Sequence, residues 1–178
     1  MNSKAINKKT LYIIDVALFI LGLAIDRVSK YFAIIKLKDH PSVSIIDGIM
    51  EFRYLENTGA AFGLLKNQKS FFVMVAIFVT LASLYVMIKT PAKKRYVSIH
   101  IYLSFILCGA IGNLIDRLMY GFVLDFIYIS VINFPIFNVA DIFVTISTLL
   151  IAILLLFVYK EDDLNFLRLV TDYHQCWS

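Results

Sequence analysis

Two aspartates in the second half of the chain lie in apolar surroundings where a carboxylate is unexpected. Asp125 lies in the run GFVLDFIYISVI, and Asp141 lies in FNVADIFVTIS, at the start of the longest apolar run. Burial disfavours the charged form of a carboxyl group and so raises its pKa. If a re-entrant turn brings these two groups together, they hold one proton between them near neutral pH. Such a pair can activate a water and protonate a leaving amine, which is aspartic-protease chemistry.

Each aspartate also has a structural interpretation. Taken alone, Asp125 is better explained as a helix N-cap or turn residue at a membrane surface. Asp141 follows Asn138 by about one turn. Thr145 and Thr148 continue this stripe, so one face of the last helix needs a polar partner. The chain has no HExxH or GxSxG motif, no glycine-rich phosphate loop and only scattered histidines. The sequence therefore lacks the motifs that metalloproteases and serine hydrolases use for catalysis.

Charged and amide side chains also occur inside two other apolar segments. Asp26 and Lys30 are four residues apart with the acid first, which favours a helical ion pair. This pair either anchors a helix end by snorkelling to the interface or supports a nearby site. In CGAIGNLIDR, small residues permit close helix contact and polar residues can bond across it. We expect the charged groups of both segments to share one cluster with the two aspartates. The glycine and polar residues concerned in the second segment are Gly109, Asn113, Asp116 and Arg117.

The elements that must position these groups are membrane helices. The chain has 178 residues, of which 60% are hydrophobic and 17% charged, and its mean hydropathy is +0.80. A soluble globule of this size cannot solvate its surface with so few charges. The sequence therefore predicts an all-α integral membrane protein. Its four transmembrane helices are expected over residues 11–32, 71–88, 97–118 and 137–159, each about 20 residues or longer.

Basic residues predict how these helices are oriented. The N-terminus carries Lys4, Lys8 and Lys9, and the connection KTPAKKRY between the second and third helices carries four more basic residues. The positive-inside rule places both in the cytoplasm, so both termini are inside and the loops after helices one and three are outside. The net charge of +4 is then a topology signal and not a nucleic-acid-binding face. A cleaved secretory signal is the alternative for the first segment. It lacks a small-x-small cleavage site, so we expect a retained helix.

The first outer loop and the cysteines complete the predicted organisation. In VSIIDGIMEFRY, two β-prone runs flank Asp47-Gly48, a dipeptide that favours a type I′ turn, so we expect a small hairpin or cradle. Cys108 and Cys176 have no CxxC spacing and no clustered partners, which predicts neither a metal site nor a disulfide. We expect one membrane domain over residues 1–160 and a cytoplasmic tail over residues 161–178.

Five motifs, in order, resemble the bacterial lipoprotein signal peptidase family, also called signal peptidase II. They are DRVSK (26–30), NTGAAFG (57–63), GAIGNLIDR (109–117), VLDF (123–126) and FNVAD (137–141). The resemblance implies a four-helix aspartic endopeptidase of the bacterial cell membrane, with its site on the extracytoplasmic side. It implies cleavage of diacylglyceryl-modified prolipoproteins before the lipidated cysteine, without a metal or organic cofactor. Cys108 stands where the family often has glycine, and we expect only altered packing there.

The resemblance also implies a role for each matching residue. Asp125 and Asp141 become the catalytic pair, and Asp26 and Lys30 support it. The implied partners are lipidated prolipoproteins and membrane lipid, without nucleic acid, and we expect a monomer. The outer hairpin and the NTGAAFG loop are expected to close over the peptide. The remaining residues expected to line or brace the site are Asn57, Gly109, Asn113, Asp116, Arg117, Asn138 and Ala140.

Two other classes of function stay open at this point. Intramembrane Asp, Lys and Arg also mark proton and ion pathways, as in a small transporter. The absence of an inverted repeat, and of charged residues at the midplane of the second and fourth helices, counts against a transport path there. A scaffold protein whose polar residues only hold helices together is the third possibility.

Overall fold

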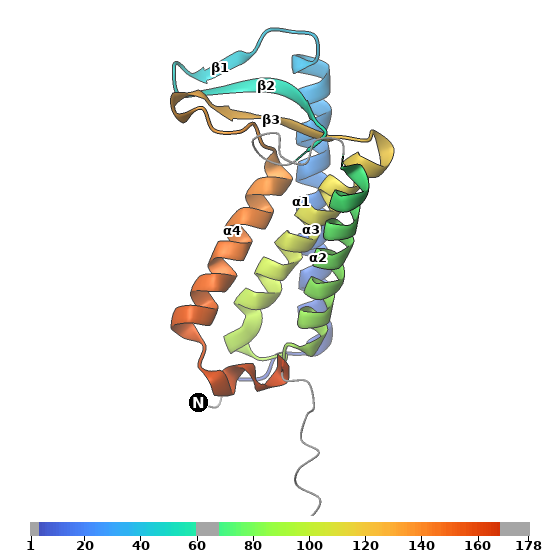
Figure 1. Ribbon diagram of the computed structural model, residues 1–178. Coiled ribbons are helices and arrows are strands. Elements are labelled where there is room, and N and C mark those ends of the chain that lie inside the picture. Colours follow the sequence, from blue (N-terminus) through green and yellow to red (C-terminus); the bar gives the residue numbers. More distant parts are fainter. Residues whose placement is uncertain (1–3, 60–67, 168–178) are drawn as a thin grey trace, which may run out of the picture.

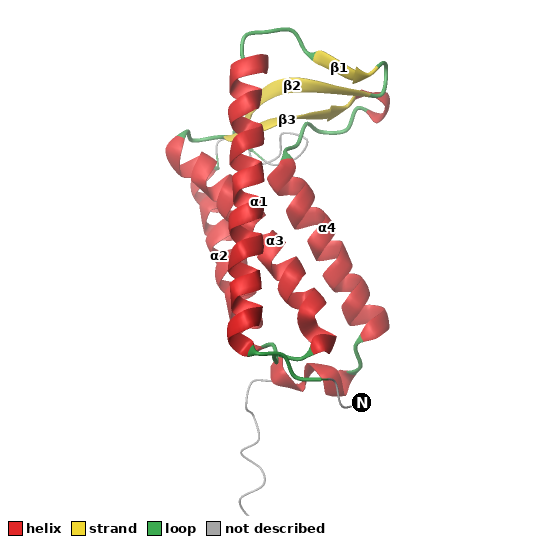
Figure 2. Cartoon of the chain, turned by 180° about the vertical axis from the view of Figure 1, so that it is seen from behind, coloured by secondary structure: helices red, strands yellow, loops and turns green. Residues whose placement is uncertain are grey.

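The chain forms a helical bundle with a small sheet at one end. The computed structural model describes residues 4–59 and 68–167. Residues 60–63 of the NTGAAFG motif and the tail from residue 168 lie outside the described residues. The ends of the described chain lie at the end of the bundle away from the sheet (Figures 1 and 2). The four long helices of the described part are α1 (Lys8–Leu37), α2 (Lys69–Lys89), α3 (Val97–Met119) and α4 (Val139–Ile153).

Three of these helices are long and apolar enough to cross a membrane. In the described chain the qualifying segments are Lys69–Lys89, Lys94–Met119 and Val139–Val158. The last includes η4 (Leu154–Val158), a short wider π-helical stretch that continues α4. Helix α1 has 30 residues but is not among them, and it carries charged residues such as Asp26 and Arg27 within its length. The helical architecture is confirmed, whereas the fourth spanning helix stays a prediction.

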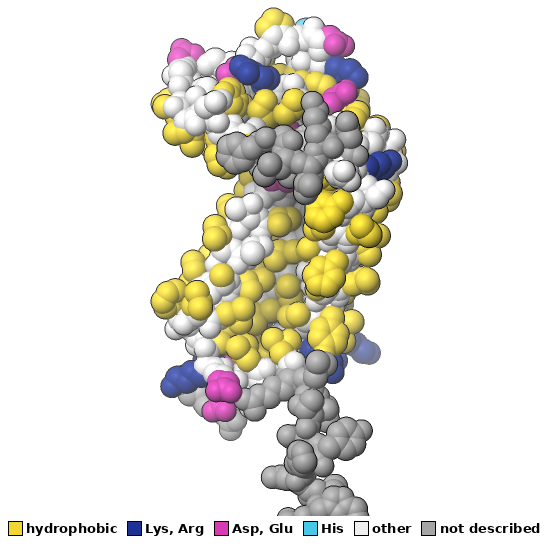
Figure 3. Space-filling view, in the orientation of Figure 1, with side chains coloured by type: hydrophobic (Ala, Val, Ile, Leu, Met, Phe, Trp, Pro, Cys, Tyr) yellow, Lys and Arg dark blue, Asp and Glu magenta, His cyan; other side chains and the backbone are white. Residues whose placement is uncertain are grey.

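The outer surface of the bundle is apolar. Phe78 on α2 is 72% exposed, and Phe157 at the end of the α4 segment is 80% exposed. Figure 3 shows apolar side chains covering the helices, with charged residues gathered at the two ends. An apolar surface this extensive is unfavourable in water, which identifies it as the surface that faces lipid.

The sheet contains one more strand than the sequence predicts. Strands β1 (Val43–Ile46), β2 (Met50–Asn57) and β3 (Val123–Ile129) form an antiparallel sheet in the order β1-β2-β3. The predicted hairpin is β1 and β2, but its turn is not type I′, because only Gly48 of the central pair has a positive φ, of 70°. Asp125 lies within β3, so its interpretation as an N-cap or turn residue is wrong.

The first four residues of strand β3, residues 123–126, are buried on both faces of the strand. Successive side chains of a strand point to opposite sides, so Leu124 and Phe126 share one face and Val123 and Asp125 the other. Leu124 and Phe126 pack against Ala33 of α1. Val123 and Asp125 face a cavity. The apolar run around Asp125 is therefore the pattern of a strand covered on both sides, which periodicity alone does not distinguish from a buried helix.

Helix α3 packs closely against its neighbours through glycine. A Cβ atom at Gly109 would lie 2.5 Å from the backbone oxygen of Ala140 and 2.7 Å from Val144 Cγ2. A Cβ atom at Gly22 of α1 would lie 2.6 Å from the sulfur of Cys108, which is fully buried. The cysteine of α3 is thus accommodated because α1 has a glycine opposite it.

The end of the bundle away from the sheet has its own polar contacts. Asp15 of α1 and His100 of α3 are buried, with 2.8 Å between Asp15 Oδ2 and His100 Nδ1. The 3-10 helix η5 (Glu161–Leu167) packs there, and its Asp163 lies 2.6 Å from the Arg95 guanidinium. Sequence reasoning found neither contact, because each joins residues that are far apart in the chain.

Replacement of Gly109 by alanine is expected to destabilise the bundle by about 1–3 kcal/mol, as in other overpacked contacts. The Ala140 oxygen belongs to the backbone of α4, so it cannot move aside without moving that helix. The measurement is the thermal unfolding midpoint in detergent. Ala17→Val, which adds methyl groups at an exposed position of α1, is the control and should leave the midpoint unchanged. An equal midpoint for Gly109→Ala and wild type would contradict the close contact.

Candidate active site

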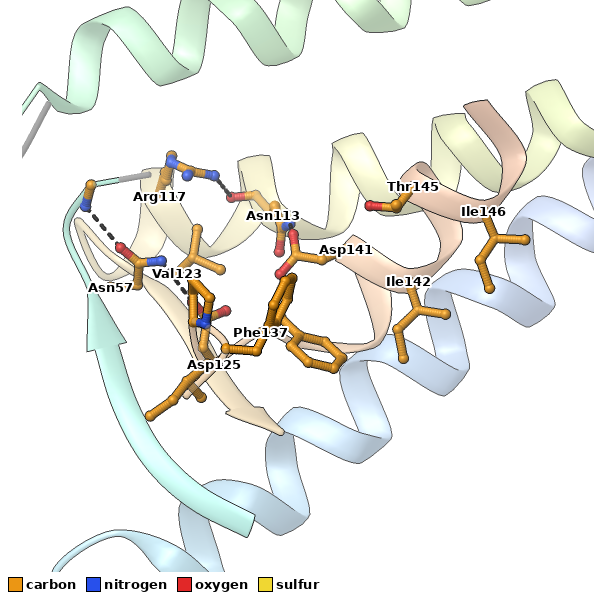
Figure 4. A pocket seen from close by; sticks show the side chains of 14 residues that line it. Asn57, Asn113, Arg117, Val123, Asp125, Phe137, Asp141, Ile142, Thr145 and Ile146 are labelled. Carbon is orange, nitrogen blue, oxygen red and sulfur yellow. Dashed lines mark hydrogen bonds between the residues drawn. The ribbon is translucent and has the colours of Figure 1, made fainter. Parts of the chain in front are cut away.

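A cavity of about 460 Å³ lies where the sheet meets the adjoining ends of α3 and α4 (Figure 4). One part of its wall is polar and the other apolar. The polar side chains that line it are Asn57, Asn113, Arg117, Asp125, Asp141 and Thr145, and its apolar side chains include Val123, Phe134, Phe137, Ile142 and Ile146.

Asp125 and Asp141 reach this cavity together because the chain doubles back between them. The backbone N–H of Ile127 donates to the oxygen of Phe137 at 2.8 Å, and the N–H of Phe137 donates to the oxygen of Ile127 at 3.0 Å. The reversal is made by the 3-10 helix η3 (Ser130–Ile132). The re-entrant turn that the sequence predicts is therefore a hairpin-like return of the chain, which places the first turn of α4 beside β3.

Asn138 connects the two aspartates and begins α4. Its side-chain oxygen accepts the N–H of Asp141 at 3.0 Å, and Asp141 Oδ2 accepts the N–H of Asn138 at 3.1 Å, which is a capping box. The amide nitrogen of Asn138 donates to Asp125 Oδ1 at 2.6 Å. Asn138 is fully buried. Through these hydrogen bonds, the N-terminus of α4 holds both carboxyl groups.

The other carboxyl oxygens are also held by amides. Asn57 Nδ2 donates to Asp125 Oδ2 at 2.7 Å, and Asn113 Nδ2 donates to Asp141 Oδ1 at 2.8 Å (Figure 4). Burial, and after it the charge of Asp141, raises the pKa of Asp125 to about 7. Hydrogen bonds from Asn57 and Asn138 act in the opposite direction. Asp125 therefore holds its proton up to about neutral pH.

Next to the aspartates, α1 and α3 share an ionic cluster of two acids and two bases: Asp26, Arg27, Lys30 and Asp116. Lys30 Nζ lies 3.1 Å from Asp26 and 2.7 Å from Asp116. Arg27 contacts the same two acids at 2.6 and 2.7 Å. Lys30 also donates to Asn113 Oδ1 at 2.9 Å. The Lys30 side chain is only 4% exposed, so the snorkelling alternative is wrong.

The ionic cluster holds the backbone beside each aspartate of the cavity. Asp26 Oδ1 accepts the N–H of Ala140, the residue before the second aspartate, at 3.2 Å. Asp116 Oδ2 accepts the N–H of Leu124, the residue before the first aspartate, at 3.4 Å. Because both acids are buried and fixed by the two bases, β3 and α4 are anchored to the same rigid group.

The structure divides the predicted site residues between the cavity and the contacts behind it. Asp116 and Arg117 are consecutive, yet Asp116 joins the ionic cluster and Arg117 lines the cavity. Thr145 also lines the cavity, whereas Thr148 is exposed and is not among its lining residues. Sequence reasoning missed the role of Arg27, because neighbouring residues of a helix are not expected to face each other. The only available signal was a base next to an acid in DRVSK.

The acid and base groups that this cavity offers are both carboxyl groups, those of Asp125 and Asp141. Two buried carboxyl groups that share a cavity can divide the roles of proton donor and proton acceptor. Within residues 4–59 and 68–167, no group of three or more His, Cys, Asp or Glu side chains is arranged to hold a metal ion. The two aspartates are placed where they can support general acid–base activation of a water.

Known proteins resemble this chain over most of its length. The family model of signal peptidase (SPase) II matches residues 18–157, which include both aspartates and the ionic cluster. A lipoprotein signal peptidase of Clostridium novyi (strain NT) is 39% identical over 145 residues, covering 80% of this chain and 97% of the relative. One of Clostridium tetani (strain Massachusetts / E88) is 38% identical over 151 residues, covering 83% and 94%. A bacterial membrane enzyme solved by the in meso method at 2.3 Å resolution is 31% identical, with a TM-score of 0.75, covering 88% of this chain and 93% of its own.

Replacement of Asn138 by serine is expected to raise the pKa of Asp125 above about 7. Serine can still cap α4, but it lacks the amide donor that lowers this pKa. The measurement is a carboxyl titration followed by isotope-edited infrared spectroscopy. Asn138→Ala loses the cap as well, so it should also destabilise the protein by about 1 kcal/mol. An unchanged Asp125 pKa in Asn138→Ser would contradict the role assigned to this amide.

Proposed function

The chain belongs to the signal peptidase II family, and we propose that it cleaves diacylglyceryl-modified prolipoproteins immediately before the lipidated cysteine. Members of this family are aspartic-type signal peptidases. The relatives of this chain are named lipoprotein signal peptidases, which supports cleavage of prolipoprotein signal peptides. The observation that carries the finer proposal is the pair of buried carboxyl groups, Asp125 and Asp141, on one cavity and joined through Asn138.

In this proposal Asp125 and Asp141 are the catalytic pair and share one proton. The ionised carboxylate takes a proton from a water, whose oxygen forms a bond to the scissile carbonyl carbon. The protonated carboxyl group donates a hydrogen bond to the carbonyl oxygen during this attack. A proton then passes to the amine nitrogen as the carbon–nitrogen bond breaks. The products are a carboxylate on the signal peptide and a free amine on the lipidated cysteine.

The neighbouring side chains support this reaction by holding the pair in place. Asn57, Asn113 and Asn138 each donate an N–H group to a carboxyl oxygen of the pair. These donors are fixed before substrate arrives, so little reorganisation is needed as charge moves between the carboxyl groups. The ionic cluster contributes by anchoring the two backbone segments.

The apolar wall of the cavity suits a substrate that carries acyl chains. Ile146 of α4 lines the cavity and is 51% exposed, so it belongs both to the cavity wall and to the lipid-facing surface. Acyl chains can remain in lipid along this side of α4 while the scissile bond reaches the aspartates. This continuity supports the choice of a lipidated substrate.

The proposal includes an orientation in the bacterial cell membrane. We place α1 as a fourth spanning helix, the cavity at the extracytoplasmic surface, and both termini in the cytoplasm. The ends of the described chain lie away from the sheet, next to the basic connection between α2 and α3 (Figure 1). An excess of Lys and Arg is typical of the cytoplasmic side of a membrane protein. One membrane domain over residues 1–160, a cytoplasmic tail over residues 161–178 and a monomer belong to the same proposal.

Asp125→Asn and Asp141→Asn are each expected to lower cleavage by about 10²–10⁴-fold, the usual contribution of a general acid or base. The measurement is release of the signal peptide from a purified diacylglyceryl-modified prolipoprotein in liposomes. Asp162→Asn, at an exposed position of η5, is the matched control and should cleave as wild type does. Full activity of either cavity variant would disprove the pair. Equal cleavage of the unlipidated precursor would disprove the requirement for lipid.

The value of kcat/KM is expected to fall as pH rises through about 7. Below that pH Asp125 carries the proton that the reaction needs. Above it both carboxyl groups are ionised, so the pair has no acid to donate. The measurement is a pH profile on the lipidated precursor, and the apparent pKa values belong to the pair. A rate that does not change from pH about 6 to about 9 would contradict this assignment.

A further inference from the structure

Among the described residues that line the cavity, Arg117 is the one cation. Unlike Arg27 and Lys30, it forms no salt bridge with an acid within the described part of the chain. Its Nη1 donates to the backbone oxygen of Asn113 at 3.4 Å, which is a long hydrogen bond. A guanidinium has five N–H donors, so most of those of Arg117 are available to a ligand in the cavity.

An aromatic ring from another helix holds this guanidinium. The guanidinium carbon of Arg117 lies 4.8 Å from the ring centroid of Phe72 on α2, within the range of a cation–π contact. No described α2 residue is among the residues that line the cavity. Helix α2 therefore reaches the site through this contact. Figure 4 shows the Arg117 side chain directed back along α3 toward Asn113, beside the cavity.

We propose that Phe72 is a positioning residue that orients Arg117 so that its N–H groups bind carbonyl or ester oxygens of the substrate. The inference rests on the proposed function, since it concerns how the lipidated substrate is held. Because the Arg117 guanidinium forms no salt bridge with a described acid, its N–H groups remain available to neutral oxygens. The face of the Phe72 ring restricts the orientation of the Arg117 guanidinium without occupying its hydrogen-bond donors. A cation–π contact is an attraction between the ring and the guanidinium charge, so it does not require an N–H hydrogen bond.

This role predicts a specific kinetic pattern. Loss of the ring leaves the charge of Arg117 in place but releases its orientation, so substrate binding weakens while the amide hydrogen bonds that hold the aspartate pair remain. Phe72→Leu should therefore raise KM by about 2- to 30-fold, the range of a cation–π contact, with kcat as in wild type. Phe72→Trp should keep KM near the wild-type value, because tryptophan is the strongest cation–π partner.

The test is steady-state cleavage of the lipidated precursor in liposomes by these two variants and by Arg117→Gln. If Phe72 acts through Arg117, Phe72→Leu has no further effect in the Arg117→Gln background. Phe78→Leu, an exposed aromatic position on the same helix, is the matched control and should leave KM unchanged. An additive loss in the double variant, or a fall in kcat with unchanged KM for Phe72→Leu, would overturn the proposal.

A binding measurement separates this proposal from the proposed function. Fluorescence anisotropy of a labelled diacylglyceryl-modified peptide gives a Kd whether or not the peptide is cleaved. A weaker Kd for Phe72→Leu and a wild-type Kd for Phe72→Trp support the role of Phe72, even if wild-type protein does not cleave the precursor. Equal Kd values for wild type and Phe72→Leu overturn it, even if cleavage by the aspartate pair is established.

Discussion

The structure around the sheet depends on one constraint, which is that two carboxyl groups are buried side by side at a single cavity. Their mutual repulsion and their loss of water both favour a proton on the pair. Asn57, Asn113 and Asn138 satisfy the carboxyl oxygens without adding charge. The pair therefore keeps its hydrogen bonds without a salt bridge, and in the proposed reaction one proton can move between its two members.

The charged residues that make this region rigid form the ionic cluster, which lies behind the aspartate pair and not in the cavity. Asp26, Arg27, Lys30 and Asp116 are neutral as a group, and each acid contacts both bases. Breaking such a buried group is costly, because each removed partner leaves an uncompensated charge. Its acids also accept the N–H groups of Leu124 and Ala140, so this rigidity reaches the backbone on both sides of the cavity. Asn113 joins the two layers, since it accepts from Lys30 and donates to Asp141.

The surrounding lipid explains why one wall of the cavity is apolar and exposed. Helix α4 carries Asp141 at its first turn and apolar residues beyond it, so under the proposed function one helix presents both a reacting group and a surface for acyl chains. A substrate anchored in lipid can then reach the aspartates by moving along the membrane. Membership of the signal peptidase II family supports hydrolysis over the transporter and scaffold alternatives.

The sequence by itself determined the long helices, the membrane class, the family and most of the polar residues of the cavity, because apolar length and short motifs are local properties. It did not reveal the third strand, since an apolar run around Asp125 has no period that separates a strand from a helix. It predicted one shared cluster for Asp116 and Arg117, whereas helix packing directs one to α1 and the other to α2. The partnership of Arg27 with Asp116, of Asp15 with His100 and of Phe72 with Arg117 was decided by tertiary structure alone. Each pairs residues on different helices, and only the packed bundle brings them within contact distance.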